Sequence, residues 1–518
     1  MTKRNIGILI TVFMLVTVGV FLSRKLQELN FERHYSSVYE NKPLGYKFGT
    51  DEEMEVDSSK SEIFTKFENS ELEITIYYDD LKRLGGVTKV EYDGYGNEGI
   101  RSSKLFSLDK EHSVKVDGIS SKVLEYSREK LSKVENDKNH YTTVSVPRTD
   151  KEIYTIAVKS KSKDIDLNKI LKGFKFTERE GKLEAFKSKS LIGSRQFNED
   201  TRAFVDRYLL KKGQQSFGIY YPSVETWDKA ADFTGLEELE QKLQYRFPAV
   251  LSYSTNTVFQ DGFGELKQNF FAAAKEQGRV PELTFSTFEG GPDISTQDEK
   301  TLDILNGKYD SVFEEYAEGF KEFGMPVLFR LNNEMNGDWV SYSSYHMGKD
   351  PELYVETYRY IHDFFEARGV DNLIYVFNPN EKSFPDFSYN SYLAYYPGDE
   401  YVDVVGLTAY NTGNYYEGEI WRSFDEAYKD LYADYSKRFD QPLIITEFSS
   451  ASTGGDKVKW FNDMFKSIKD YDRIKLAVLW NGTDWDMKDG KNIPAREYRI
   501  DENDEVIEAV RDGLQNFK

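Results

Sequence analysis

The sequence predicts an α/β protein: a parallel (β/α)8 barrel of the TIM type, preceded by a membrane anchor and a small α+β domain. Three observations lead to this prediction. An uncharged apolar run stands near the N-terminus, short alternating segments follow, and apolar segments then alternate with helical ones. We therefore divide the chain into an anchor (1–25), a stalk (26–50), a small accessory domain (51–180), a linker (181–204) and the barrel (205–518).

The composition is that of a folded, acidic protein. Of 518 residues, 39% are hydrophobic and 30% are charged, which is enough for a core and a soluble surface. The formal net charge of −21 argues against nucleic acid as a partner, because phosphate-backbone binding needs clustered Lys and Arg. The chain has no cysteine, which excludes disulfides, thiolate nucleophiles and Cys-ligated zinc.

The predicted anchor is the uncharged run from Ile6 to Leu22, which has basic residues on both sides. Its length is at the lower end of the ~17–25 residues that span a bilayer. A cleaved signal peptide and a buried core helix are the alternatives, but no small-x-small cleavage site follows the run. We expect an uncleaved anchor in a single-pass protein of the cell membrane, with the barrel outside the cell.

The accessory domain is predicted from segments in which apolar and polar residues alternate, as in half-buried antiparallel strands. The expected strands are 72–78, 141–146 and 152–158, with helical segments near 124–134 and a last piece at 165–176. No catalytic constellation stands out, so a spacer or interaction domain is the simplest interpretation. Carbohydrate binding and docking to an envelope or polysaccharide-synthesis partner are the alternatives.

From residue 205 the pattern changes to strand, then helix, then strand. The candidate strands are 217–221, 249–253, 282–287, 327–331, 373–377, 402–407, 443–446 and 476–480, and the helices include 236–244, 265–277, 309–323, 351–368, 424–439 and 457–469. A doubly wound open sheet is the alternative. No Gly-rich phosphate loop follows any of these strands, which argues against that sheet and against a nucleotide cofactor.

Two candidate strands run from apolar residues into a glutamate: Glu334 lies just beyond the fourth strand, and Glu447 ends the seventh. Asn378, Tyr410 and Trp480 fall near the ends of the fifth, sixth and eighth. Active sites of parallel barrels lie at the C-terminal ends of the strands, so all five side chains should face one mouth. One such glutamate is usually an ordinary surface residue. A pair is what glycosidic cleavage needs: one acid for the leaving oxygen, and one carboxylate to attack or to activate water.

Within this pair, Glu334 fits the acid, because burial and a neighbouring negative charge keep a carboxyl protonated. Glu447 then fits the nucleophile. Tyr410 is a candidate hydrogen-bond donor to Glu447, or else an ordinary packed tyrosine. Arg330 stands four residues before Glu334 in an otherwise apolar strand. It should point inward, where the carboxylates are its obvious partners.

Two tryptophans are the remaining candidates for substrate contact. Trp339 and Trp480 either offer flat faces to the apolar C–H groups of sugar rings or fill the top of the core. The five histidines form no cluster with metal-ligand spacing. We therefore expect neither a metal nor a cofactor.

The run 330–339, Arg-Leu-Asn-Asn-Glu-Met-Asn-Gly-Asp-Trp, resembles the acid/base segment of glycoside hydrolase family 26, which typically reads Arg-x-x-His-Glu-Met-Asn-Gly-x-Trp. Segments 369–380, 396–410 and 446–448 are also similar to that family and occur in its order. The resemblance implies a retaining, endo-acting enzyme on β-linked polysaccharide. It also implies that Glu334 is the acid/base and Glu447 the nucleophile. Tyr410 would contact the nucleophile, and Trp339 and Trp480 would line the sugar subsites.

One residue departs from this pattern, because Asn333 stands where the family's mannanases usually carry His. In the wider clan of related barrels an Asn at this place contacts the sugar 2-hydroxyl, which is axial in mannose and equatorial in glucose and xylose. β-Mannan, β-glucan, xylan and a mixed exopolysaccharide therefore all stay open as substrates. Arg330, Asn333 and Asn378 complete the set of expected substrate-binding residues.

The leading hypothesis is a membrane-anchored, extracellular, retaining endo-β-glycanase that uses two glutamates. The alternative is a non-catalytic scaffold that binds carbohydrate or takes part in exopolysaccharide assembly. Both hypotheses require the barrel, and they differ in whether the two glutamates act on the glycan.

Overall fold

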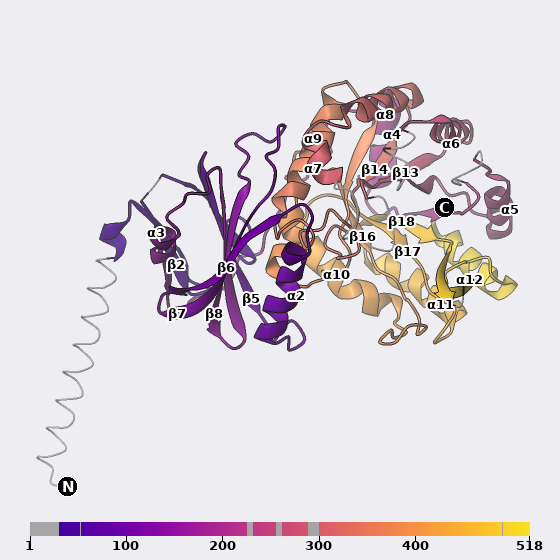
Figure 1. Ribbon diagram of the computed structural model, residues 1–518. Helices are drawn as coiled ribbons and strands as arrows, with labels where there is room; N and C mark the ends of the chain where they lie inside the picture. Colours follow the sequence, from indigo (N-terminus) through magenta and orange to yellow (C-terminus); the bar gives the residue numbers. More distant parts are fainter. Residues whose placement is uncertain are drawn as a thin grey trace, which may run out of the picture. The chain divides into compact units, whose positions relative to one another are not determined.

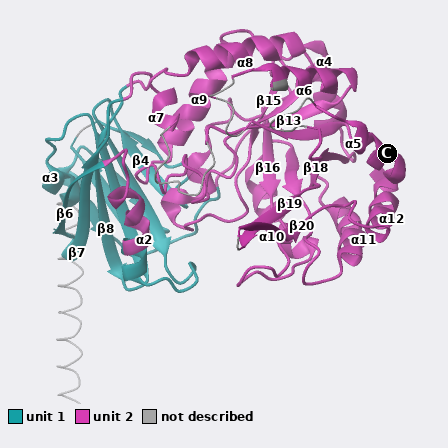
Figure 2. Cartoon of the chain, turned by 45° about the vertical axis from the view of Figure 1, so that its right-hand side comes forward, with its two compact units in different colours: residues 1–93, 107–130, 136–185 teal, residues 94–106, 131–135, 186–518 magenta. Residues whose placement is uncertain are grey.

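The computed structural model describes residues 31–51, 53–224, 231–254, 259, 262–288, 300–488 and 490–517. The predicted anchor lies outside these residues. Among the residues described, no helix is long and apolar enough to cross a membrane. The chain forms two compact units (Figure 2). The first comprises residues 1–93, 107–130 and 136–185, and the second comprises residues 94–106, 131–135 and 186–518.

The first unit is built on two antiparallel sheets, with orders β1-β2-β10 and β3-β4-β5-β9-β8-β7-β6 (Figure 1). The strands are β1 (Ser37–Asn41), β2 (Tyr46–Thr50), β3 (Glu55–Asp57), β4 (Phe64–Glu68), β5 (Leu72–Asp80), β6 (Ser107–Val116), β7 (Ile119–Ser127), β8 (His140–Thr149), β9 (Glu152–Ser160) and β10 (Phe174–Phe176). Helix α3 (Leu167–Lys172) precedes β10, and helix α2 (Lys89–Arg101) runs from this unit into the second.

Two expectations for this region are wrong. Residues 37–50 are not a stalk, because β1 and β2 pair with each other and β2 pairs with β10. Tyr46 and Phe48 are buried, and Tyr46 stacks on Phe174 at 5.7 Å. The helical segment expected near 124–134 begins inside β7, which pairs with β6 and β8. Its local pattern fits either structure, and strand pairing decides in favour of the sheet.

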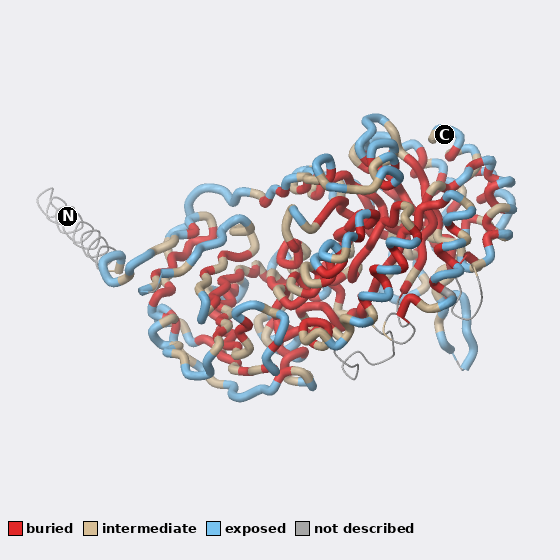
Figure 3. The backbone as a smooth tube through the Cα atoms, turned by 90° about the horizontal axis from the view of Figure 1, so that it is seen from above, coloured by how far each residue is buried: buried red, intermediate tan, exposed pale blue. Residues whose placement is uncertain are grey.

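The second unit contains a closed barrel of eight parallel strands, which confirms the predicted fold. The strands are β11 (Ser216–Tyr220), β12 (Ala249–Tyr253), β13 (Val280–Phe285), β14 (Val327–Leu331), β15 (Leu373–Phe377), β16 (Val404–Thr408), β17 (Leu443–Phe448) and β18 (Ile474–Trp480). Strand β18 pairs with β11 from Ser216↔Leu476 to Tyr220↔Trp480, and this pairing closes the barrel. The strands are buried on both faces, as short apolar runs in parallel sheets are (Figure 3).

Helices on the outside of the barrel follow most of the strands. They are α5 (Thr234–Leu243), α6 (Glu265–Glu276), α7 (Lys300–Ile304), α8 (Asp310–Phe323), α9 (Glu352–Glu366), α10 (Phe424–Arg438), α11 (Lys457–Ser467) and α12 (Asp504–Leu514). Their ends follow local sequence signals. Helix α10 begins with a capping box formed by Ser423 and Glu426, and α8 ends at Gly324 with a φ of 69°.

The predicted linker does not stay a linker to its end. Helix α4 (Glu199–Phe204) occupies the last six residues of this segment, and a turn of π-helix (Val205–Leu209) follows directly. Phe204, Val205 and Leu209 are buried in one cluster with side chains of the barrel strands, including Ala249, Leu328 and Ile444. This segment comes immediately before β11, so it fills the end of the barrel opposite the C-terminal ends of the strands.

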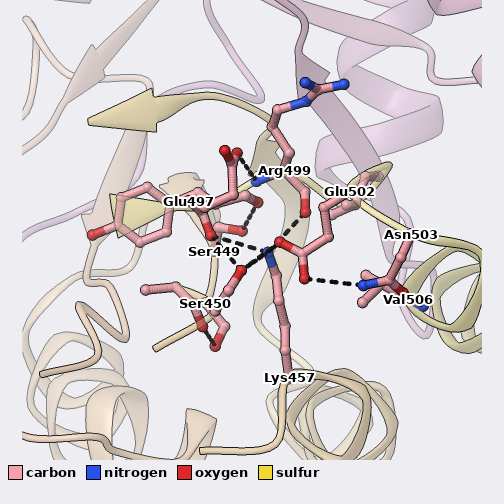
Figure 4. A network of polar contacts seen from close by, with 12 residues as sticks. Ser449, Ser450, Lys457, Glu497, Arg499, Glu502, Asn503 and Val506 are labelled. Atoms are coloured by element: carbon pink, nitrogen blue, oxygen red, sulfur yellow. Dashed lines mark hydrogen bonds and ion pairs between the residues drawn. The ribbon is translucent and has the colours of Figure 1, made fainter. Parts of the chain in front are cut away.

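A polar network supports the chain after β18 (Figure 4). The chain forms a hairpin of β19 (Thr483–Lys488) and β20 (Lys491–Glu497) before it reaches α12. The buried Nζ of Lys457 lies 3.1 Å from the Glu497 carbonyl, 2.7 Å from the Arg499 carbonyl and 2.9 Å from Oε2 of Glu502. These oxygens satisfy the buried ammonium and connect α11 to the segment behind β20.

Candidate active site

Glu334 lies three residues beyond β14, in a backbone conformation that few residues adopt. Asn332 has a φ of 47° and Glu334 a φ of 53°, both in the left-handed region. Hydrogen bonds hold this backbone in place: Asn332 N donates to the Phe285 carbonyl at 3.0 Å, and Glu334 N donates to the Asn378 carbonyl at 2.7 Å. Strands β13 and β15 therefore hold the turn on both sides, and strain of this kind clusters at functional sites.

The Glu334 carboxyl is set for proton transfer near neutral pH. Glu334 is partly exposed, so a ligand can reach its side chain. Burial and the negative charge of Glu447 raise the pKa of Glu334 to about 7, while a hydrogen bond from Asn380 and the charge of Arg330 oppose the rise. A carboxyl with this pKa is present in both protonation states at neutral pH, as a group that acts as acid and then as base requires.

Glu447 is the second-last residue of β17 and is buried, with 6% of its surface exposed. The hydroxyl of Tyr253 donates a hydrogen bond to its Oε2 oxygen, and Nη2 of Arg330 lies 3.3 Å from the same oxygen. Trp480 Nε1 donates to the Tyr253 hydroxyl at 3.0 Å. The last residues of β12 and β18 thus orient the carboxyl at the end of β17.

The structure gives Tyr253 the role that we expected for Tyr410. Tyr410 follows β16, and its ring lies edge-on to Trp480 at 6.3 Å. Burial, then the charge of Glu447, raise the pKa of the Tyr410 hydroxyl well above its usual value. Sequence reasoning missed Tyr253, although it is the last residue of a predicted strand and a tyrosine at that place is a usable signal.

Arg330 is fully buried and its guanidinium joins four strands. Its Nε donates to Thr284 Oγ1 at 2.8 Å, and its Nη1 donates to Asn378 Oδ1 at 3.2 Å. Its Nη2 reaches Glu447, as the expected inward orientation requires. Asn378 is also fully buried, and its Nδ2 donates to Thr408 Oγ1 at 3.0 Å. Arg330 and Asn378 are thus buried beside the carboxylates, and their expected contact with substrate stays a prediction.

A third carboxyl, Glu282, lies in the barrel interior and was not predicted. It is fully buried on β13, and its Oε1 is 3.9 Å from Nε of Arg330. Neither carboxyl oxygen has a hydrogen-bond partner among the described residues. Burial raises the pKa of Glu282, and the charge of Glu447 adds to this rise, while the charge of Arg330 opposes it. The resulting pKa is about 8, so Glu282 is mostly protonated at neutral pH.

The other predicted site residues lie on the same side of the barrel. Asn333 is partly exposed, and Tyr342 donates to its carbonyl at 2.7 Å. Trp339 is 37% exposed, with its ring 5.4 Å from that of Phe384. Trp480 stacks on Tyr220 at 5.3 Å with an angle of 11° between the rings. Asn333 and Trp339 thus lie close to Glu334 in the chain, while Trp480 packs beside Tyr253, which bonds to Glu447.

Residues 261–478 match the model of Glycosyl hydrolase family 26. The match covers less than half of the chain, and we call residues 261–478 the family-26 region. The family-26 region includes both Glu334 and Glu447, so the resemblance stated from the sequence motifs is confirmed. Tyr253, at the end of β12, stands just before the matched residues.

Curated relatives of the family-26 region include two glycanases. "Endoglucanase H" of Acetivibrio thermocellus is 34% identical over 224 residues, which are 41% of this chain and 23% of that protein. The "Mannan endo-1,4-beta-mannosidase" of Bacillus subtilis is 31% identical over 227 residues, 40% of this chain and 57% of that protein. The chain therefore spans less than two thirds of the length of these relatives. A solved structure of a Cellulomonas fimi endo-beta-1,4-mannanase double mutant aligns over 64% of this chain and 77% of that chain, with 16% identity and a TM-score of 0.46.

Proposed function

We propose that the protein hydrolyses a β-linked polysaccharide as a retaining endo-β-glycanase, with Glu334 as acid/base and Glu447 as nucleophile. The observation that carries this proposal is the pair of carboxyls at the ends of β14 and β17. Glu334 has a pKa of about 7, and Glu447 accepts hydrogen bonds from Arg330 and Tyr253. The family of residues 261–478 supports the class of reaction.

The proposed reaction has two steps. A Glu447 oxygen bonds to the anomeric carbon while Glu334 gives its proton to the glycosidic oxygen, and the bond between that carbon and oxygen breaks. The leaving chain departs as an alcohol, and the sugar stays as an ester of Glu447. In the second step Glu334 takes a proton from water, the water oxygen bonds to the anomeric carbon, and Glu447 leaves as a carboxylate.

The charge on Glu447 explains how Glu334 can act as an acid in the first step and as a base in the second. While Glu447 is ionised, its charge raises the pKa of Glu334, which favours the acid form. Formation of the ester removes that charge, so the pKa of Glu334 falls and the carboxylate form needed by a base is favoured. The same pair therefore sets the acid for cleavage and the base for hydrolysis.

The substrate is proposed only as a class: β-mannan, a β-glucan or an exopolysaccharide. The relatives named as an endoglucanase and a mannan endo-1,4-beta-mannosidase support this class. Asn333, partly exposed next to the acid, is the residue whose contact with a 2-hydroxyl would separate mannose from glucose. Analysis of the products from β-mannan, cellulose-type glucan, mixed-linkage glucan and xylan would identify the sugar.

Release of reducing ends by the wild type and by Glu334→Gln and Glu447→Gln tests the mechanism. We expect each variant to lose at least about 1,000-fold in kcat on polysaccharide without loss of folding. With an aryl glycoside whose leaving group needs no proton, Glu334→Gln should still form the glycosyl-enzyme, while Glu447→Gln should not. A wild type that binds glycan and releases no ends would favour the scaffold hypothesis.

We also propose that the uncharged run Ile6–Leu22 anchors the protein in the cell membrane, with the barrel outside the cell. The run and its flanking basic residues support this proposal. Extraction of membranes with alkaline carbonate tests it. The full chain should stay in the membrane fraction and a fragment of residues 26–518 should not; full extraction of both would disprove the anchor.

A further inference from the structure

A short segment from the first third of the chain, residues 94–106, belongs to the compact unit of the barrel. It lies well before the family-26 region, which begins at residue 261. Several of its contacts lie on one loop, residues 332–349, which carries the proposed acid/base, and the Gly96 carbonyl also accepts a hydrogen bond from Tyr389 at 3.5 Å. The segment is therefore an addition to the barrel at the place where the substrate would be cleaved.

Four specific contacts hold the segment on this loop. The Tyr95 hydroxyl donates to Asp338 Oδ2, and the Tyr95 ring stacks on that of Tyr345 at 5.0 Å and 29°. Lys349 Nζ donates to Asn97 Oδ1 at 2.6 Å. At Gly99, a Cβ atom would lie 2.0 Å from the Tyr345 carbonyl oxygen, so only glycine permits this approach.

The loop under this segment connects directly to the active site. Glu334 is near its start, Trp339 follows five residues later, and Lys349 is near its end. Asn332, Glu334 and Lys349 all have a positive φ, so both ends of the loop are held in conformations that neighbouring contacts must stabilise. Residues 95 and 97 therefore contact the far part of the loop that carries Glu334, at positions 338, 345 and 349.

Aromatic side chains are exposed at this place. Tyr95 is 42% exposed, Trp339 37% and Phe384 43%, although most aromatic side chains of the barrel are buried. Tyr95 bonds to Asp338, the neighbour of Trp339 in the chain, and Phe384 packs against Trp339, so the three rings gather around residues 338 and 339. Exposed aromatic groups that gather beside an active site mark a binding surface.

We propose that Tyr95 is a substrate-binding residue that, with Trp339 and Phe384, forms a distal subsite for the polysaccharide on the leaving-group side of the cleaved bond. This inference rests on the proposed function. The side follows from the chemistry, because the acid stands next to the leaving oxygen and the three rings lie along the loop that starts at the acid. The chemistry of the surface fits a sugar chain: ring faces contact apolar C–H groups, and the partly exposed Asp338 accepts hydrogen bonds from hydroxyls.

Steady-state kinetics of Tyr95→Ala on two substrates test the subsite. One substrate is the polysaccharide that the wild type cleaves fastest, and the other is an aryl glycoside whose leaving group is too short to reach Tyr95. We expect KM for the polysaccharide to rise about 3- to 10-fold, as loss of one aromatic contact does, and kcat/KM for the aryl glycoside to change less than about 2-fold. Equal effects on both substrates, or no effect on the polysaccharide, would overturn the proposal.

Tyr95→Phe separates contact with the sugar from positioning of the loop. It keeps the ring and loses only the hydrogen bond to Asp338, so KM for the polysaccharide should stay within about 2-fold of wild type. A KM as high as that of Tyr95→Ala would show that the hydroxyl matters and the ring does not, which contradicts the subsite. Leu210→Ala is the matched control, since Leu210 is 40% exposed but lies just before β11, at the opposite end of the barrel.

Gly99→Ala tests whether the segment must be docked. Alanine favours a helix more than glycine does, so in an undocked segment the substitution would leave the stability of the helix unchanged or increase it. In the docked segment the new Cβ meets the Tyr345 carbonyl, and KM for the polysaccharide should rise at least as far as in Tyr95→Ala. A wild-type KM in Gly99→Ala would overturn the proposal. A wild type without activity on any β-glycan would refute the proposed function instead, so the two failures are distinguishable.

Discussion

The guanidinium of Arg330 lies 3.3 Å from the Oε2 oxygen of Glu447, and both side chains are buried. Arg330 comes from β14 and Glu447 from β17, so one ion pair joins the two strands whose ends carry the proposed catalytic carboxyls. The positive charge compensates for the burial of Glu447 and opposes the rise in the pKa of Glu334. A change at Arg330 should therefore affect both stability and activity.

Replacement of Arg330 by Lys should lower both the stability of the protein and its activity. Lysine keeps the charge but loses the planar fork that reaches Thr284, Asn378 and Glu447 together. We expect kcat to fall about 100-fold, as loss of one preorganised donor does, and the free energy of unfolding to fall by about 3 kcal/mol. Kinetics and urea unfolding measure the two effects.

Arg279→Lys is the matched control for this prediction. Arg279 is as buried as Arg330, and its guanidinium pairs with both oxygens of Glu240 on α5 at 2.6 and 2.7 Å. It stands just before β13, at the far end of the barrel from Glu334. We expect a similar loss of stability with kcat nearly unchanged below the unfolding transition. An equal fall in kcat in both variants would mean that Arg330 acts through stability alone.

Tyr253→Phe should reduce activity more than Tyr410→Phe. Tyr253 donates a hydrogen bond to the Glu447 carboxylate, and a hydrogen bond to a charged group contributes about 1.5–3 kcal/mol, which corresponds to roughly 10- to 150-fold in rate. The rate of formation of the glycosyl-enzyme, measured as a pre-steady-state burst with an activated aryl glycoside, reports this step. A larger loss in Tyr410→Phe would restore the role that the sequence predicted for Tyr410.

The activity should fall as the pH rises through about 7. The first step needs protonated Glu334, whose pKa burial and Glu447 raise to about 7, so kcat/KM on polysaccharide should be highest below that pH and decrease above it. In Glu447→Gln the neighbouring charge is gone, and the pKa of Glu334 should fall. Carbon NMR of labelled glutamate in wild type and variant measures this directly. An unchanged pKa would show that Glu447 does not influence Glu334.

Glu282 should make the protein less stable as the pH rises. Its carboxyl has a usual pKa of 4.5 and a pKa of about 8 in the folded protein. Between these values the folded state holds a proton that the unfolded state has lost, so the free energy of unfolding decreases with pH in this window, by at most about 1.4 kcal/mol per pH unit. Urea unfolding between pH 5 and pH 8.5 measures the slope.

Glu282→Gln should flatten this slope, because glutamine cannot ionise. The comparison with Glu508→Gln, on the exposed surface of α12, controls for loss of a carboxylate as such. If Glu282→Gln keeps the wild-type slope, the buried carboxyl does not titrate in this window.

The strands of the barrel could be predicted from the sequence, because each is a short apolar run bounded by polar turns. The observed bounds of these strands differ little from the predicted ones. The positions of Glu334 and Glu447 at strand ends could be predicted for the same reason, because each residue follows or ends such a run. Segment 37–50 and the region 124–134 were misassigned. Their local patterns are weak, and pairing with distant strands determines their structure.

The sequence by itself determined the fold class, the resemblance to glycosyl hydrolase family 26 and the choice of two candidate glutamates, because these depend on local patterns and on motifs in a fixed order. The tertiary structure alone decided that Tyr253 and not Tyr410 bonds to Glu447, that Glu282 lies under Arg330, and that Tyr95 reaches the loop of the acid. These contacts join residues up to 243 positions apart in the chain. Closure of the barrel and docking of residues 94–106 bring them together, and no local pattern in the sequence records such proximity.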